Sequence, residues 1–130
     1  MEAAMKRNIL IVDDERDIVV ILKLALEKEG YQVTEAFDGV EALAKVSEVK
    51  PDLILLDIMM PKMDGYTMNL KLKSNPETAS IPVIIITGRG QLKELIQAYK
   101  DVAIAAFMEK PFTVAMLLNN IKEVLGENKQ

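Results

Sequence analysis

The chain has 130 residues, half of them hydrophobic, with 28% charged residues and a net charge of -4. This length suits one globular domain with its own core and leaves no room for a second domain. The mildly acidic balance argues against direct binding of nucleic acid over a broad surface. The absence of cysteine and histidine excludes disulfide bonds, thiol catalysis, and the most common general base and zinc ligand. Chemistry in this chain must therefore use carboxylates, hydroxyls, lysine or arginine.

The amino terminus and the apolar runs give no sign of membrane targeting. The first residues lack the basic-then-apolar order of a signal peptide. The longest apolar runs, such as residues 53–56 and 83–86, are far too short to span a bilayer. We therefore expect a cytoplasmic protein that would act at a membrane only through a partner.

Short β-like runs alternate with helix-length amphipathic segments from the start of the chain. Residues 8–12 are apolar and β-branched and predict a strand, and residues 17–29 place their apolar side chains on one helical stripe. Gly30 favours the end of that helix, and residues 31–36 predict a second strand. Asp38 and Gly39 then lead into a helix that carries apolar residues between positions 40 and 46. The first third of the chain therefore predicts two strand-helix pairs.

The same alternation continues to the carboxyl end. Residues 53–57 predict a third strand, followed by a loop at 60–65 and a helix at 66–74. Residues 81–87 predict the fourth strand, with a helix near 92–99. A fifth strand near 104–109 and a last helix at 113–125 complete five strand-helix pairs.

The composition of the strands predicts how they are arranged. They are nearly continuous runs of isoleucine, leucine and valine, as required of a parallel sheet that is buried on both faces. Parallel strands also need crossover connections, which the helices provide. We therefore expect a doubly wound α/β fold, with a five-stranded parallel sheet flanked by five helices. It forms a single domain over residues 1–130, with a core at about residues 7–126.

Polar side chains follow four of the predicted strands. Asp13 and Asp14 come after the first strand, Asp57 ends the third, Thr87 ends the fourth and Lys110 follows the fifth. In such folds, ligands bind beyond the carboxyl ends of the strands. Neighbouring carboxylates repel by roughly 4 kcal/mol per pair at an intermediate dielectric, so they take up protons or bind a cation. With oxygen ligands only, Mg²⁺ or a similar ion fits better than zinc.

These residues stand within longer motifs that together resemble a known family. The motifs are Ile11-Val12-Asp13-Asp14-Glu15, Leu55 to Gly65 (which includes Asp57, Pro61, Lys62 and Asp64), Ile86-Thr87-Gly88 and Glu109-Lys110-Pro111-Phe112. Their order and spacing over nearly the whole chain are similar to those of the receiver domains of two-component response regulators. The resemblance implies the flavodoxin-like receiver fold, with strand order 2-1-3-4-5.

The resemblance also implies a phosphorylation site at Asp57. In that family the corresponding aspartate accepts a phosphoryl group from a sensor histidine kinase or a histidine phosphotransfer protein. Carried over to this chain, Asp13, Asp14, Asp57 and the backbone carbonyl of Met59 would hold Mg²⁺ or Mn²⁺. Such a domain is a phosphoacceptor that catalyses only its own phosphorylation and dephosphorylation, and is not otherwise an enzyme.

Further residues are assigned to phosphate binding, switching and partner docking in the same way. Thr87, the amide of Gly88 and Lys110 would contact the phosphoryl oxygens, and Thr87 with Phe107 would switch the face formed by the fourth helix, fifth strand and fifth helix. This face would control an effector protein or an output domain outside this chain. The residues implied in partner docking are Pro61, Asp64, Gly65, Pro111 and Phe112. Pro111 matches a family proline that follows a cis peptide bond, although most bonds before proline are trans.

Several alternatives remain open from the sequence. Asp14 alone is equally well explained as a turn or cap residue, and Phe107 as ordinary core. A phosphatase with an aspartyl-phosphate intermediate is disfavoured, since the position of its usual second acid is Met59. A receiver-like binding module that is never phosphorylated is a further alternative, although such modules usually lack one of the site residues. Residues 103–106, Ala-Ile-Ala-Ala, depart from the more acidic family pattern, which favours a monomer or a weak phosphorylation-dependent dimer.

Overall fold

The structure is a computed structural model that describes residues 6–57 and 65–127. Five parallel strands form one sheet in the order β2-β1-β3-β4-β5, which confirms the expected topology. The strands are β1 (Asn8–Val12), β2 (Gln32–Ala36), β3 (Leu53–Asp57), β4 (Val83–Thr87) and β5 (Ala106–Glu109). The helices are α1 (Arg16–Lys28), α2 (Gly39–Val49), α3 (Gly65–Ser74), α4 (Leu92–Ala98) and α5 (Val114–Leu125).

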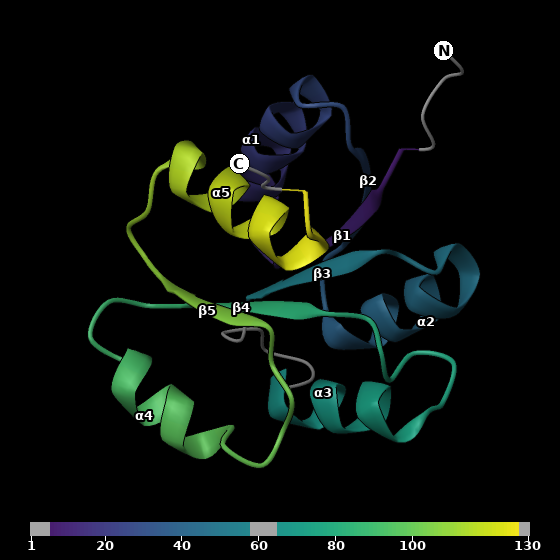
Figure 1. Ribbon diagram of the computed structural model, residues 1–130, viewed down its shortest axis with the longest axis vertical. Coiled ribbons are helices and arrows are strands. Elements are labelled where there is room, and N and C mark those ends of the chain that lie inside the picture. Colours follow the sequence, from purple (N-terminus) through teal and green to yellow (C-terminus); the bar gives the residue numbers. More distant parts are fainter. Residues whose placement is uncertain (1–5, 58–64, 128–130) are drawn as a thin grey trace.

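The helices cover both faces of the sheet, as parallel strands with helical crossovers require. Helices α1 and α5 lie on one face, and α2, α3 and α4 lie on the other (Figure 1). The central strands β3 and β4 are buried along their whole length, which explains their continuous apolar composition. The doubly wound arrangement predicted from the sequence is therefore confirmed.

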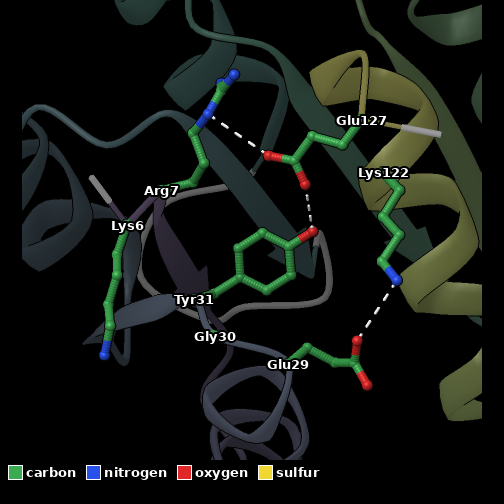
Figure 2. Close-up of a pocket in the computed structure, with 7 residues that line it drawn as sticks. All are labelled: Lys6, Arg7, Glu29, Gly30, Tyr31, Lys122 and Glu127. Carbon is green, nitrogen blue, oxygen red and sulfur yellow. Dashed lines mark hydrogen bonds and ion pairs between the residues drawn. The ribbon is translucent and has the colours of Figure 1, made fainter. Parts of the chain in front are cut away.

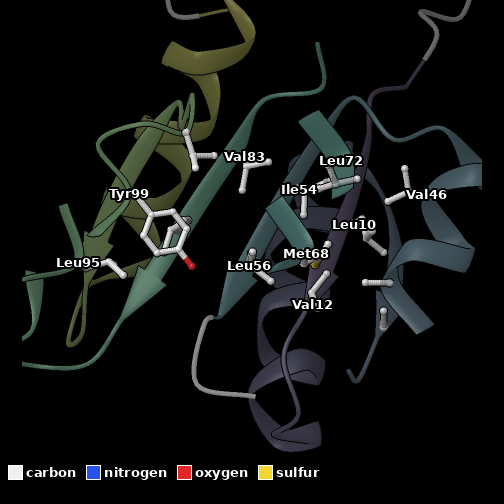
Figure 3. Packing of buried hydrophobic residues seen from close by; sticks show 14 residues of the cluster. Leu10, Val12, Val46, Ile54, Leu56, Met68, Leu72, Val83, Leu95 and Tyr99 are labelled. Carbon is white, nitrogen blue, oxygen red and sulfur yellow. The ribbon is translucent and has the colours of Figure 1, made fainter. Parts of the chain in front are cut away.

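Each face of the sheet has its own hydrophobic core. Figure 3 shows the larger cluster, in which alternate residues of β1 and β3 pack against α2 and α3. Its labelled members are Leu10, Val12, Val46, Ile54, Leu56, Met68, Leu72, Val83, Leu95 and Tyr99. The intervening strand residues point to the opposite face, where Ile9, Ile11 and Leu55 pack with α1 and α5. Because both sets of alternate residues are buried, the sheet is held rigidly on both sides and presents its carboxyl edge as a fixed platform.

The predicted strand starts are wrong at three places. The second strand starts at Gln32, since the amide of Tyr31 donates to Leu26 O at 3.1 Å and closes α1. The fourth strand starts at Val83 because Pro82 has no amide hydrogen and the carbonyl of Ile81 accepts from Lys73 Nζ at 3.1 Å. The fifth strand starts at Ala106, two residues after the predicted start, where the ladder pairs it with Ile84.

A hydrogen bond and ion pairs hold the end of α5 at the amino edge of the sheet, away from the carboxyl ends of the strands. Tyr31, buried just before β2, donates its hydroxyl hydrogen to Glu127 at 2.9 Å, and Arg7 pairs with the same carboxylate at 3.5 Å (Figure 2). Lys122 pairs with Glu29 at 3.4 Å. Burial and the bond to Glu127 raise the pKa of Tyr31 above its ordinary value. These contacts therefore fix the carboxyl-terminal helix without involving the carboxyl edge of the sheet.

Candidate functional site

Asp57 is the last residue of the central strand β3. Its neighbour in β4 is Ile86, and its side chain is almost completely buried, with the whole residue 4% exposed. A carboxylate is rarely buried to this extent unless it is paired with a cation or hydrogen-bonded. Here Lys110 Nζ donates to Asp57 Oδ2 at 3.1 Å. The fold therefore holds an acid and a base residue, 53 positions apart in sequence, in direct contact.

Lys110 is positioned by the end of β5. Its amide donates to the carbonyl of Thr87 at 2.9 Å, and the Lys110–Pro111 peptide bond is cis, as the resemblance implied. Its ammonium also lies 3.9 Å from Glu15 Oε1. Burial lowers the pKa of Lys110, but the hydrogen bond and charge of Asp57, with the charges of Asp13 and Glu15, raise it above its ordinary value overall. Lys110 therefore stays positively charged at neutral pH.

Asp13 is the second buried acid of the site. Its amide donates to Ala36 O at 3.1 Å, and its Oδ1 accepts the amide of Glu15 at 2.9 Å. Burial raises the pKa of Asp13 to about 6, and the charge and hydrogen bond of Asp57 act in the same direction, against the amide of Glu15 and the charge of Lys110. Asp13 therefore carries a proton more readily than an ordinary aspartate.

Three carboxylates meet at this edge within the described parts of the chain. One oxygen each of Asp13, Glu15 and Asp57 lies within 4.8 Å of the others. The donor set consists of oxygen atoms only, as hard divalent cations such as Mg²⁺ or Mn²⁺ prefer. A cation would also replace the proton that burial favours on Asp13. These side chains therefore fit the expected metal ion.

The composition of this acidic group differs from the sequence prediction. Asp14 is exposed and lies outside this group of three, so its part in metal binding stays a prediction, whereas Glu15, which the sequence prediction did not include, belongs to the group. The Glu15 amide donates to the Asp13 side chain, and the Glu15 carboxylate lies 3.9 Å from Lys110 Nζ. The missed signal was the third consecutive acidic residue after β1.

Thr87, at the end of β4, has an unusual environment. Its residue is completely buried, and its hydroxyl Oγ1 has no hydrogen-bond partner among the described residues. A hollow of about 210 Å³ beside it is lined by Thr87, Gln91, Glu94 and Leu95. A buried hydroxyl without a partner costs stability and calls for an explanation in function. Thr87, at the carboxyl end of β4, therefore has a hydroxyl that is available to a new partner.

Replacing Thr87 with valine is expected to stabilise the unmodified protein by about 1 kcal/mol, since valine has the same shape without the unpaired hydroxyl. Urea unfolding measures this change. Thr78→Val is the matched control, because Thr78 is also buried but donates to Leu72 O at 2.6 Å. The control is expected to lose about 1 kcal/mol. Equal losses in both variants would contradict the assignment of an unpaired hydroxyl to Thr87.

Phe107 and Gly88 are two further residues that the sequence predicts to act with Thr87. Phe107, in β5, is partly buried and packs edge-on against Tyr99, the residue that follows α4, with ring centroids 6.3 Å apart. Tyr99 in turn packs against Tyr66 of α3 at 5.3 Å. Gly88 follows Thr87 directly, and a side chain there would make only ordinary contact with Gln91, at 3.8 Å. Phe107 is thus part of the core while lying one strand away from Thr87, so packing and switching remain compatible.

Some predicted site residues lie outside the described parts of the chain, namely Met59, Pro61 and Asp64. Gly65 begins α3. Pro111 and Phe112 line an apolar hollow of about 300 Å³ together with Ile18, Ile21, Leu22, Lys110 and Val114. Because Lys110 both lines this hollow and contacts Asp57, the hollow adjoins the acidic group.

Within residues 6–57 and 65–127, no helix has the length and apolarity to cross a membrane.

Comparison with known proteins identifies the family. The sequence matches the response regulator receiver domain family over residues 9–122. It is 38% identical over 118 residues to the DNA-binding dual master transcriptional regulator RpaA of Synechocystis, covering 91% of this chain and 48% of that protein. It is also 38% identical over 121 residues to the sporulation initiation phosphotransferase F of Bacillus subtilis, covering 93% of this chain and 95% of that protein.

Solved structures agree with the sequence comparison. The chemotaxis response regulator CheY4 of Vibrio cholerae superposes with a TM-score of 0.85 at 29% identity, covering 92% of this chain and 99% of that one. A CheY-like receiver domain protein from Methanospirillum hungatei gives 0.85 at 33% identity, covering 95% and 96%. This chain spans 48% of RpaA and 26% of the response regulator PleD of Caulobacter vibrioides, but nearly all of the sporulation protein. The chain belongs to the receiver domain family of two-component response regulators.

Proposed function

We propose that this receiver domain accepts a phosphoryl group on Asp57 in the presence of Mg²⁺ or Mn²⁺. The observation that carries the proposal is the buried Asp57 carboxylate, which contacts Lys110 at 3.1 Å and lies within 4.8 Å of the oxygens of Asp13 and Glu15. Phosphoryl transfer depends mainly on positioning and on neutralising the equatorial oxygens. Asp57 is fixed by its strand, and Lys110 supplies a positive charge at its side.

The donor is a phosphohistidine on a sensor histidine kinase or a histidine phosphotransfer protein. A carboxylate oxygen of Asp57 forms the new bond to phosphorus while the phosphorus-nitrogen bond breaks and its electron pair returns to the imidazole. Asp13 and Asp57, with Asp14 or Glu15 and the Met59 carbonyl, would hold a divalent cation that would supply further positive charge at the phosphoryl group. Lys110 stabilises the developing charge, and Thr87 and the Gly88 amide donate hydrogen bonds. The chain then acts as a phosphoacceptor and not as an enzyme for other substrates.

The same residues support a switch. The Thr87 hydroxyl, which has no partner among the described residues, gains acceptors when Asp57 is phosphorylated. Movement of Thr87 toward the phosphoryl group would leave room for Phe107 and reshape the α4-β5-α5 face. Two states that differ by a few kcal/mol are sufficient for phosphorylation to shift their populations. The output is a change in binding of an effector protein or output domain.

The apolar hollow beside Lys110 supports docking of the phosphodonor. Ile21, which is 56% exposed, lines this hollow together with Pro111, Phe112 and Lys110, and Lys110 contacts Asp57. The Ile21→Asp substitution is expected to slow transfer from a phosphorylated histidine phosphotransfer protein about tenfold or more, because it places a charge in an apolar interface. Labelling by acetyl phosphate, which needs no protein docking, should not change.

The control for docking is Leu24→Asp. Leu24 is 64% exposed on the same helix but does not line the hollow. Both variants are compared by following transfer from one donor that phosphorylates the wild-type protein. Equal slowing by Ile21→Asp and Leu24→Asp would contradict docking at the hollow, and equal slowing with acetyl phosphate would indicate damage to the site itself.

Incubation with acetyl phosphate, followed by intact mass measurement, tests the phosphoacceptor function. We expect one phosphoryl group on the wild-type protein in the presence of Mg²⁺, little without the ion, and none on Asp57→Asn. A receiver-like module that is never phosphorylated would stay unlabelled. The same label on Asp57→Asn would also overturn the proposal, and equal labelling without a divalent cation would contradict the metal role of the acidic group.

A further inference from the structure

The loop between β4 and α4 is held at both ends by consecutive residues of β5 and its continuation. At its start, the carbonyl of Thr87 accepts the amide of Lys110 at 2.9 Å. At its far end, the amide of Gly90 donates to Oε2 of Glu109. Glu109 and Thr87 are also paired in the sheet register. The end of β5 therefore fixes a loop that belongs to the neighbouring strand.

The bond from Gly90 restrains a segment with little intrinsic order. Gly90 has φ of +83°, a left-handed conformation that glycine adopts without steric cost. Gly88 is also free of a side chain, so the backbone between Thr87 and Gln91 has many accessible conformations. A single hydrogen bond to a charged carboxylate can therefore decide which of these conformations is most populated.

The conformation held in this way leaves Thr87 unpaired. Its hydroxyl is completely buried without a partner among the described residues, next to the hollow of about 210 Å³ that Gln91, Glu94 and Leu95 also line. In the switch proposed above, Thr87 moves toward the phosphoryl group on Asp57 and the Gly88 amide donates to it, which shifts this loop relative to β5. The bond between Gly90 and Glu109 resists this shift.

We propose that Glu109 is a positioning residue that holds the β4–α4 loop in the unphosphorylated arrangement and thereby opposes phosphorylation of Asp57. This inference rests on the proposed function and deepens it. Two consecutive residues then have opposite effects: Lys110 contacts Asp57 and favours phosphoryl transfer, whereas Glu109 contacts the loop and restrains it. A ligand or modification that favours one state shifts the population by its difference in affinity for the two states.

Glu109→Ala removes the acceptor and tests the inference with two readouts. Exchange of the Gly90 amide hydrogen, followed by NMR, should be about tenfold faster than in the wild-type protein, since its hydrogen bond is lost. The initial rate of labelling by acetyl phosphate with Mg²⁺ should rise about three- to tenfold, because the phosphorylated arrangement becomes easier to reach. Glu109→Gln keeps a weaker acceptor and should give intermediate values in both measurements.

Glu123→Ala is the charge control, because it removes one negative charge from an exposed position on α5. It should leave both readouts unchanged. Faster Gly90 exchange in Glu109→Ala together with an unchanged or slower labelling rate would overturn the inference while leaving the phosphoacceptor function intact. Unchanged Gly90 exchange would show that the hydrogen bond does not restrain the loop, and would overturn it too. Failure to label the wild-type protein would overturn both proposals.

Discussion

Asp13→Asn is expected to raise the free energy of unfolding of the metal-free protein by about 2–3 kcal/mol at about pH 8. Asp13 is 2% exposed, and burial raises its pKa from 3.8 to about 6, so its ionised form is disfavoured in the folded state. Because the folded pKa lies above the unfolded one, the stability associated with the protonated group is fully present below 3.8. It is lost as the pH rises through about 6. Asparagine removes this loss and still accepts the Glu15 amide.

Urea unfolding in the presence of a chelator measures this effect at two pH values. The advantage of Asp13→Asn over the wild-type protein should be large at about pH 8 and close to zero at about pH 3.5. Asp14→Asn is the control, since Asp14 is exposed, and it should change stability by less than about 0.5 kcal/mol. Mg²⁺ should stabilise the wild-type protein and have much less effect on Asp13→Asn. An Asp13→Asn variant less stable than the wild-type protein at the higher pH would contradict this account.

Lys110→Ala is expected to slow labelling of Asp57 by acetyl phosphate about 100-fold. Within the described residues, the Lys110 ammonium contacts the Asp57 carboxylate at 3.1 Å. Its removal leaves the negative charge of the phosphoryl oxygens less well neutralised. The effect on stability should be smaller than for a fully buried ion pair, because the Lys110 side chain is 36% exposed. The initial rate with saturating Mg²⁺ gives the measurement.

Two further variants separate charge from position. Lys122→Ala removes a partly exposed lysine that pairs with Glu29 at the amino edge of the sheet, away from Asp57, and should leave the labelling rate unchanged. Lys110→Arg keeps the charge with a different shape and should recover only part of the rate. A Lys110→Ala rate within about threefold of the wild-type rate would mean that the contact with Asp57 does not assist transfer.

The sequence predicted the fold well because β1, β3 and β4 are nearly continuous apolar runs, as a parallel sheet covered on both faces requires, although β2 and β5 are less apolar. The strands β1 and β3 were predicted to the residue, whereas three starts were wrong, two of them at a local contact: Tyr31 with Leu26 and Ile81 with Lys73. The first is a backbone bond at the end of α1 and the second a bond from a side chain of α3, and periodicity reveals neither. Residues 103–106 show the same limit, because only the ladder determines that β5 begins at Ala106.

The site was predicted in part. Asp13, Asp57, Thr87 and Lys110 come together because each directly ends or follows a parallel strand, so topology alone brings them to one edge. Glu15 was missed because its place depends on the turn after β1, in which its amide bonds to Asp13. The Glu109 contact was missed for a similar reason, since it depends on the conformation of Gly90.

Finding which residue carries the phosphoryl group is the most direct test of Asp57 as the phosphoacceptor. An acyl phosphate formed with acetyl phosphate and Mg²⁺ can be reduced with borohydride, which converts the modified aspartate into homoserine, and peptide mass mapping then locates the change. We expect homoserine at position 57 and at no other aspartate. Homoserine at another position with Asp57 unmodified, or no conversion in a sample whose intact mass shows one added phosphoryl group, would contradict the assignment of Asp57 as the phosphoacceptor.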